Sequence, residues 1–333
     1  MKKFNYLLIS SIAVSLFINS CSSRQYFEPK SVDENYTAKI EELDFNIIDF
    51  RVDSAILENY KYITKDGISK ESLENNFRFL NQNNSTVLAS DRNNTLLIKD
   101  NDKVNKIRFN SNIISASSNE KYIALSFIDN SISLYDRDSN KTVFKEYIKE
   151  SLLNDTKIAN PIFLNSLIMY PTLDGKIIIL DIETKKISNI LNLDPENNIN
   201  NIIILSTIGD TLVSATSTKI FSFVSGRLNQ KDFNIKQIMI ESEYIYLVTL
   251  EGLIVKLDKN LKEISSQKFK FANFHTLGNS KEYIYSLESQ GYIVRLDKDL
   301  NSSKVMGFEF DNEEKSISIG DKLYYEDKVI ELK

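Results

Sequence analysis

The sequence predicts an all-β fold built from one repeated hairpin unit. Two stretches, residues 243–258 and 282–297, carry the same pattern 39 positions apart. Each is an apolar run, a two-residue turn ending in Gly, and a second apolar run ending in Asp. This pattern is typical of a β-hairpin in which Gly252 or Gly291 adopts a positive φ angle. An internal repeat of this length indicates the architecture of the whole chain.

The same frame recurs along the chain at intervals of 34 to 45 residues. The residues that close the second run of each copy are Asp66, Asp100, Asp136, Asp181, Val224, Asp258, Asp297 and Lys333. The second runs, such as residues 177–180, are apolar at nearly every position, which indicates strands covered on both faces. A solenoid would need regular periods. The unequal intervals therefore favour an eight-bladed β-propeller.

The last unit has only three strand patterns before the sequence ends, so its blade needs a fourth strand from elsewhere. Residues 37–43, which precede the first unit, have the length and pattern of such a strand. Closing the ring in this way removes the unpaired edges of an open array. We therefore expect an N-terminal strand in the last blade, with Ile40 and Leu43 buried.

The N-terminus has the pattern of an export signal. Lys2 and Lys3 precede an apolar segment over residues 4–18, which is short for a membrane span and typical of a signal-peptide core. The sequence that follows, Ile18-Asn19-Ser20-Cys21, resembles the bacterial lipobox, whose Cys is lipidated and becomes the first mature residue. Cys21 is also the single cysteine of the chain.

The lipobox resemblance implies three regions. Residues 1–20 are expected to be a lipoprotein signal peptide, residues 21–36 a lipidated tether, and residues 37–333 the propeller. Ser22, next to the lipidated Cys21, implies sorting to the outer membrane rather than retention at the inner membrane. The membrane is thus expected to be a partner through the lipid anchor alone.

Composition argues against several classes of function. The formal charge is −5 and basic residues do not cluster, so nucleic acid is not expected as a partner. His275 is the only histidine and lies in an apolar stretch, where we interpret it as a hydrogen-bonded strand residue. The sequence has no EF-hand pattern, no Gly-rich phosphate loop and no G-x-S-x-G motif. We expect no catalytic residues, no metal and no cofactor, and hence a protein that is not an enzyme.

Two repeated residue types have structural interpretations. We expect the Asp after each strand to accept backbone N–H groups in an Asx-turn rather than to join a ring of carboxylates. Tyr244 and Tyr246, like Tyr283 and Tyr285, lie two positions apart on one strand face. We expect them to pack between blades with each hydroxyl reaching a polar partner. A stacking platform for a ligand is the alternative.

The repeats at residues 179–187 and 255–264 carry Leu-Asp followed by a polar turn. They resemble the repeats of quinoprotein-like β-propellers, although the chain has no Trp and the turn Gly is replaced. Quinoprotein enzymes stack their cofactor on Trp beside a calcium site, and neither feature can be placed here. With the lipobox and eight units, the mature chain resembles the BamB family of lipoprotein propellers. This resemblance implies a periplasmic scaffold, anchored to the outer membrane, that assists β-barrel assembly through protein contacts.

The resemblance also implies a partner-binding connection between two blades. In BamB-like proteins a connection of this placement contacts the barrel-assembly protein through apolar residues and an arginine. The matching residues here are Leu191, Leu193, Asp194 and Pro195, and no arginine follows them. Because Leu191 and Leu193 are expected in a loop, we expect charged substitutions there to leave folding intact. A tolerated insertion without function is the alternative.

Two other functions use the same features. One is a surface-exposed lipoprotein that binds a host or cell-wall ligand, and the other is a periplasmic glycan binder. The sequence does not separate a scaffold from a host-binding protein, because both would bind through loops.

Overall fold

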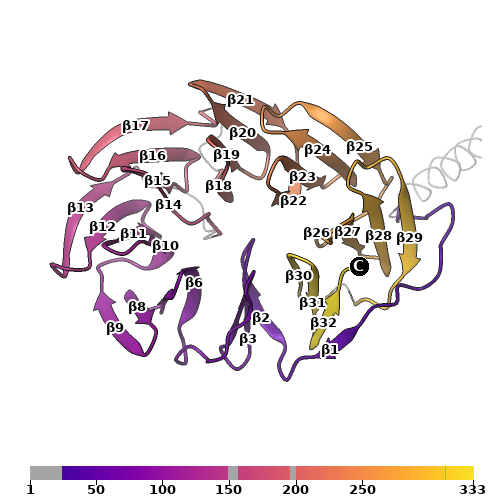
Figure 1. Ribbon diagram of the computed structural model, residues 1–333, viewed down its shortest axis with the longest axis horizontal. Coiled ribbons are helices and arrows are strands. Elements are labelled where there is room, and N and C mark those ends of the chain that lie inside the picture. The colour runs from indigo at the N-terminus through magenta and orange to yellow at the C-terminus, as the bar shows by residue number, and fades with distance from the viewer. Residues whose placement is uncertain (1–24, 149–156, 196–199, 312) are drawn as a thin grey trace, which may run out of the picture.

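The strands form a closed ring of eight blades (Figure 1). The protein is described by a computed structural model over residues 25–148, 157–195, 200–311 and 313–333. Each blade is a four-stranded antiparallel sheet, and every named element of the described residues is a strand. The prediction of an eight-bladed β-propeller is confirmed.

Blades 1 to 4 follow one another along the chain. Blade 1 contains β2 (Ile47–Phe50), β3 (Ala55–Leu57), β4 (Tyr62–Thr64) and β5 (Gly67–Ile68). Blade 2 contains β6 (Arg78–Asn83), β7 (Thr86–Ser90), β8 (Thr95–Asp100) and β9 (Lys103–Arg108). Blade 3 contains β10 (Ile113–Ser118), β11 (Tyr122–Phe127), β12 (Ser131–Asp136) and β13 (Lys141–Tyr147). Blade 4 contains β14 (Ile162–Leu164), β15 (Leu167–Pro171), β16 (Lys176–Asp181) and β17 (Lys186–Asn192).

Blades 5 to 8 complete the ring. Blade 5 contains β18 (Ile204–Ile208), β19 (Thr211–Ala215), β20 (Lys219–Val224) and β21 (Arg227–Asp232). Blade 6 contains β22 (Ile235–Ile240), β23 (Tyr244–Thr249), β24 (Leu253–Asp258) and β25 (Glu263–Lys268). Blade 7 contains β26 (Gly278–Asn279), β27 (Tyr283–Glu288), β28 (Tyr292–Asp297) and β29 (Ser303–Gly307). Blade 8 contains β30 (Ser316–Ile319), β31 (Lys322–Tyr325), β32 (Lys328–Glu331) and the N-terminal strand β1 (Ile40–Glu42).

The core lies in the seams between blades. All six residues of β12 are buried, whereas the outer strand β13 alternates between exposed and partly buried positions. Each hydrophobic cluster joins neighbouring blades, as where Leu96 of blade 2 packs with Leu125 of blade 3. A buried Leu or Ile contributes about 1.5–3 kcal/mol, so many such side chains in each seam bind the blades together.

The hairpin turns use the residues that positive φ angles require. Gly252 and Gly291 have φ angles of 75° and 86°, as the repeat predicted. At Gly252 an added Cβ would also lie 2.4 Å from the carbonyl oxygen of Phe269, so the turn leaves no room for a side chain. Elsewhere Asn takes this role, with φ angles of 66° at Asn94 and 59° at Asn130.

The predicted closing strand is present. In β1, Ile40 pairs with Ile330 and Glu42 pairs with Lys328 of β32. Leu43 is buried and packs with Ile47 and Tyr324 across the seam between blades 8 and 1. The expectation that Ile40 is buried was wrong, since its side chain is 55 % exposed. β1 is the outermost strand, and its residues are uncovered by any further blade.

The expected tether is largely docked on the ring. Residues 25–36 run along the outer side of blade 7 before they reach β1 (Figure 1). Phe27 is buried. The N–H groups of Asp33 and Tyr36 donate to two carbonyl groups of β29, those of Val305 and Gly307. This polar stretch docks on the ring for two reasons. The apolar side chain of Phe27 is removed from water, and the unpaired edge of β29 gains hydrogen-bond partners.

Blade 1 is smaller than its neighbours. Its β3 and β4 have three residues each and β5 has two, whereas β8 and β12 have six. Asp66, expected to close a strand, therefore lies in the turn between β4 and β5. Lys333 likewise lies beyond β32, which ends at Glu331.

A cationic side chain crosses the inside of the ring. The Arg51 guanidinium, which follows β2, donates hydrogen bonds to the carbonyl oxygens of Ile114 in blade 3 (3.0 Å) and Ile158 before blade 4 (2.7 Å). The residues after Ile158 continue this bracing, since Ala159 donates its N–H to Ile202 and Asn160 donates its amide to Leu80. Burial lowers the pKa of Arg51 from its usual value, and Asp53 opposes that shift.

Ring closure can be tested by two truncations. Deleting residues 22–44 should lower the free energy of unfolding by about 2 kcal/mol or more relative to deleting residues 22–38. The longer deletion alone removes β1 and the buried Leu43. Urea unfolding followed by circular dichroism measures the difference. Equal unfolding midpoints would mean that the ring is closed by other contacts.

Candidate functional site

A broad, open hollow lies over the turns of blades 1 to 4. Its volume is about 850 Å³. It is lined by Lys65, Asp66, Gln82, Asn83, Asn84, Ser118, Asn119, Glu120, Lys121, Tyr122, Asn165, Ser166, Ile182 and Glu183. These residues lie in turns, or at the strand ends beside them, between first and second strands or between third and fourth strands, so the hollow lies on one face of the ring. We call it the polar hollow.

Hydrogen bonds fix the shape of the polar hollow. The Asn83 side-chain oxygen accepts the Ser118 N–H at 2.9 Å, which ties blade 2 to blade 3. The Asn119 side-chain oxygen accepts the N–H groups of Lys121 (3.0 Å) and Tyr122 (2.7 Å), which sets the turn of blade 3. These amides are therefore held before any partner arrives.

Blade 4 supplies a cation to the same region. The Lys185 ammonium lies 4.3 Å from the centre of the Tyr122 ring and donates to its hydroxyl at 3.1 Å. Both charge signs occur among the lining residues, as Lys65 and Lys121 stand beside Asp66, Glu120 and Glu183. A mixed, hydrogen-bonding surface of this kind suits a polar protein loop.

A metal centre is not formed by the described residues. Nowhere among them do three His, Cys, Asp or Glu side chains gather closely enough to hold an ion. In residues 25–333, outside the gaps in the description, there is also no helix of the length and apolarity that a membrane crossing demands.

The expected partner-binding connection is mostly buried. Leu191 lies inside β17, and Leu193 is 2 % exposed and packs with Met169, Ile202 and Leu212. The expectation that Leu191 is a loop position was therefore wrong. Leu193 lies in the connection, as expected, but its burial contradicts the expectation that a charged residue there would leave folding intact.

The two polar residues of that connection differ from each other. Asp194 is 3 % exposed and accepts hydrogen bonds from Lys219 at 3.2 Å and Asn200 at 3.1 Å. Pro195 is exposed. Residues 196–199 of the connection fall outside the described residues, and Asn200 and Asn201, which follow them, are buried.

The burial of Leu193 gives a stability prediction. Leu193→Ala should lower the free energy of unfolding by about 2–5 kcal/mol, because it empties a packed site between blades. Ile190→Ala, in the exposed part of β17, should cost less than about 1 kcal/mol. Chemical denaturation of both variants measures the contrast. If Leu193→Ala were as stable as Ile190→Ala, Leu193 would be an unpacked loop residue, as the sequence had suggested.

Most of the repeated Asp residues have the predicted turn role, whereas the Asp100 carboxylate accepts hydrogen bonds from the Thr86 hydroxyl and the Arg137 guanidinium. Asp181 accepts the N–H of Thr184 at 2.7 Å, and Asp258 accepts that of Asn260 at 2.8 Å. Asp297 accepts the N–H of Asp299 at 2.9 Å. These carboxylates shape their own turns.

The paired tyrosines pack between blades as predicted. Tyr246 joins a cluster with Val294 and Leu296 of blade 7, and its hydroxyl donates to the Lys298 carbonyl at 2.8 Å. Tyr285 packs likewise against Leu323 of blade 8. Its hydroxyl, however, is buried without a hydrogen-bond partner in the described residues.

His275 departs from its expected role as a hydrogen-bonded strand residue. It lies outside the named strands, with its ring edge-on to Phe310 at 5.1 Å. Its Nε2 is buried and has no hydrogen-bond partner among the described residues. Burial, with a smaller contribution from Lys236, lowers the pKa of His275 to about 4.

The low pKa of His275 predicts a pH dependence of stability. An unfolded His titrates near pH 6.5, so between about pH 6.5 and 4 the unfolded chain binds the proton more readily than the folded chain. The contribution of His275 to the free energy of unfolding is complete above pH 6.5 and is lost as the pH falls from about 6.5 to 4. His275→Gln should therefore lose less thermal stability than the wild type between pH 7 and 4.5. Equal losses in calorimetry would contradict the buried, neutral histidine.

Comparison with known proteins gives two kinds of similarity. No family model matches the chain. The chain is 32 % identical over 163 residues to plasminogen-binding protein PgbB of Helicobacter pylori strain J99. It is also 32 % identical over 148 residues to PgbB of strain 26695. The matches cover 48 % and 44 % of this chain but only 30 % and 27 % of the relatives, so the chain spans less than a third of their length.

The similarity to solved structures extends over most of the ring. BamB from Moraxella catarrhalis superposes with a TM-score of 0.63 at 14 % identity, over 88 % of this chain and 98 % of that one. The C-terminal WD40 domain of Sif2 gives 0.63 at 12 % identity, over 90 % and 100 %. At such low identity these matches show the fold alone.

Sequence reasoning missed the polar hollow. Its signal was weak, because Asn83, Asn119 and Asn165 look like ordinary turn residues. Only the ring brings them to one face. Cys21, the predicted lipidation site, lies outside the described residues.

Proposed function

We propose that the chain is an exported lipoprotein, anchored through Cys21, whose propeller binds a protein partner and catalyses no reaction. The observation that carries this proposal is the polar hollow. Its side chains stand on turns held by fixed strand ladders, and such turns are where rigid scaffolds carry binding sites.

A barrel-assembly role is the first specific form of this proposal. It is supported by the lipobox and by the fold shared with BamB, which leads us to place the propeller in the periplasm at the outer membrane.

A host-binding role is the second specific form, and the sequence comparison favours it. Identity of 32 % over 163 residues to a plasminogen-binding protein is a closer relationship than a shared fold. In this form the propeller is exposed at the cell surface and its partner is a host protein such as plasminogen.

Protease treatment of intact cells separates the two forms. A periplasmic scaffold should survive and should co-purify with the barrel-assembly complex. A host-binding lipoprotein should be cleaved and should bind plasminogen on a sensor surface. A protein that is protected from protease but does not capture the assembly complex would contradict the barrel-assembly role. A protein that is cleaved but does not bind plasminogen would contradict plasminogen as the host partner.

A charge substitution tests the hollow as the binding site for whichever partner is captured. Ser166 and Glu183 are exposed lining residues, so changing both to Arg should leave the fold intact and weaken capture about tenfold or more. Ser242 and Glu243 form an exposed turn of blade 6, and the same changes there make a matched control that should bind as the wild type does. Equal binding by both variants would remove the hollow from the proposal.

A further inference from the structure

The N-terminal segment enters the ring through a buried phenylalanine. The Phe27 ring lies edge-on to Phe269 (centroids 6.1 Å apart) and to Tyr292 (5.9 Å apart). Phe269 follows β25 of blade 6, and Tyr292 begins β28 of blade 7. Phe27 is 7 % exposed, so it fills the outer end of the seam between these two blades.

Hydrogen bonds hold the segment in place after Phe27. The N–H groups of Asp33 and Tyr36 donate to the carbonyl oxygens of Val305 and Gly307, each at 2.8 Å. The Tyr36 hydroxyl donates to the Glu331 carbonyl at 3.0 Å. The chain is thus fixed to the rim of the ring from Phe27 through to β1.

The fixed entry point limits how the propeller can sit on a membrane. Cys21 precedes Phe27 by six positions, and a fully extended chain spans at most about 3.3–3.6 Å per residue, or roughly 20 Å here. We infer that the rim of blades 6 and 7 faces the lipid surface, an inference that rests on the proposed anchoring at Cys21. Blades 6 and 7 then lie nearer to the membrane than blades 2 and 3.

Exposed side chains near this entry point fit a lipid surface, and those of blade 6 lie in turns on the face opposite the polar hollow. Tyr26, Leu250 and Phe271 are 54 %, 62 % and 41 % exposed, and the Lys270 ammonium lies 4.6 Å from the centre of the Phe271 ring. The Phe269 N–H donates to the Gly252 carbonyl at 2.8 Å, which holds the turn of Leu250 beside the connection that carries Phe271. Aromatic residues with a flexible Lys are the side chains that favour the boundary between lipid and water. We call these four residues the anchor rim.

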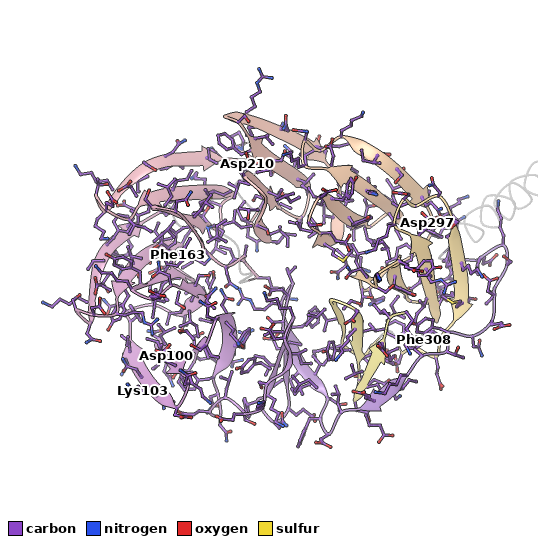
Figure 2. All side chains as sticks on the ribbon, viewed as in Figure 1. Asp100, Lys103, Phe163, Asp210, Asp297 and Phe308 are labelled. Carbon is purple, nitrogen blue, oxygen red and sulfur yellow. The ribbon has the colours of Figure 1, made fainter. Side chains whose placement is uncertain are left out.

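The same arrangement presents the polar hollow away from the membrane. The hollow lies over blades 1 to 4, and blade 3 is four blades from blade 7 in a ring of eight. Figure 2 shows Asp297 and Phe308 of the blade 7 side across the ring from Asp100 and Lys103 of blade 2. A partner could therefore reach the hollow without passing the bilayer.

Energy transfer from the protein to the membrane tests the orientation. Cys21 is the only cysteine and its sulfur is consumed by lipidation, so an introduced cysteine takes a donor dye at one place. Lys270→Cys labels the anchor rim, and Lys145→Cys labels the exposed outer strand of blade 3. The full lipoprotein is placed in vesicles of phosphatidylethanolamine and phosphatidylglycerol that contain an acceptor lipid. We expect strong energy transfer to the acceptor lipid from a dye on Lys270→Cys and much weaker transfer from a dye on Lys145→Cys.

Phe27 variants test the cause of that difference. Phe27→Ala should release the segment as far as Asp33, double the reach of the anchor and narrow the difference between the two labels. Phe27→Leu should keep the difference in energy transfer between the two labels. Circular dichroism checks that each variant is folded. Equal transfer from both labels in a wild type that floats with the vesicles would overturn the orientation, and an unchanged difference in Phe27→Ala would overturn the role of Phe27. A wild type that fails to float would instead overturn the anchoring at Cys21.

Discussion

The pairing of β1 with β32 is the constraint on which the rest of the molecule depends. Each blade is stabilised by apolar side chains in the seams on both its sides, so every blade needs two neighbours. The ladder between β1 and β32 completes blade 8 and brings blade 8 beside blade 1. Leu43, Ile47 and Tyr324 then pack in one cluster between the two blades. The ladder pairs Ile40 with Ile330, 290 positions further along the chain, so closure costs chain entropy that only the completed ring offsets.

Features written in local sequence were predicted from it. The hairpin turns at Gly252 and Gly291, the apolar third strands and the turn-forming Asp297 each depend on neighbouring residues. The closing strand was predicted because the last unit lacked one strand and a suitable segment stood at the other end. Packing of Tyr246 between blades followed from its place on the strand face.

Features that depend on distant parts of the ring were not predicted. Leu193 is followed by Asp-Pro and looks like a loop residue, yet it packs against residues of blades 4 and 5. Lys256 interrupts an apolar strand, and the structure buries its stem while its ammonium reaches Asp299 of blade 7 at 2.7 Å. Phe27 stands in a polar stretch, and only the seam between blades 6 and 7 gives it a place. In each case the deciding partner lies far away in the sequence.

The N-terminal segment thus closes the ring and fixes the place at which the proposed lipid anchor would leave it, which links the fold to the proposed function. Hydrogen–deuterium exchange read by mass spectrometry tests this account most directly. Amides exchange slowly where the strand that carries them opens only with the whole domain. The account predicts that the amides of β32 that face β1 exchange as slowly as those of the buried strand β12 of blade 3. Exchange of these β32 amides as fast as that of the exposed turns, with β12 still protected, would show that the ring is not closed by its N-terminal strand.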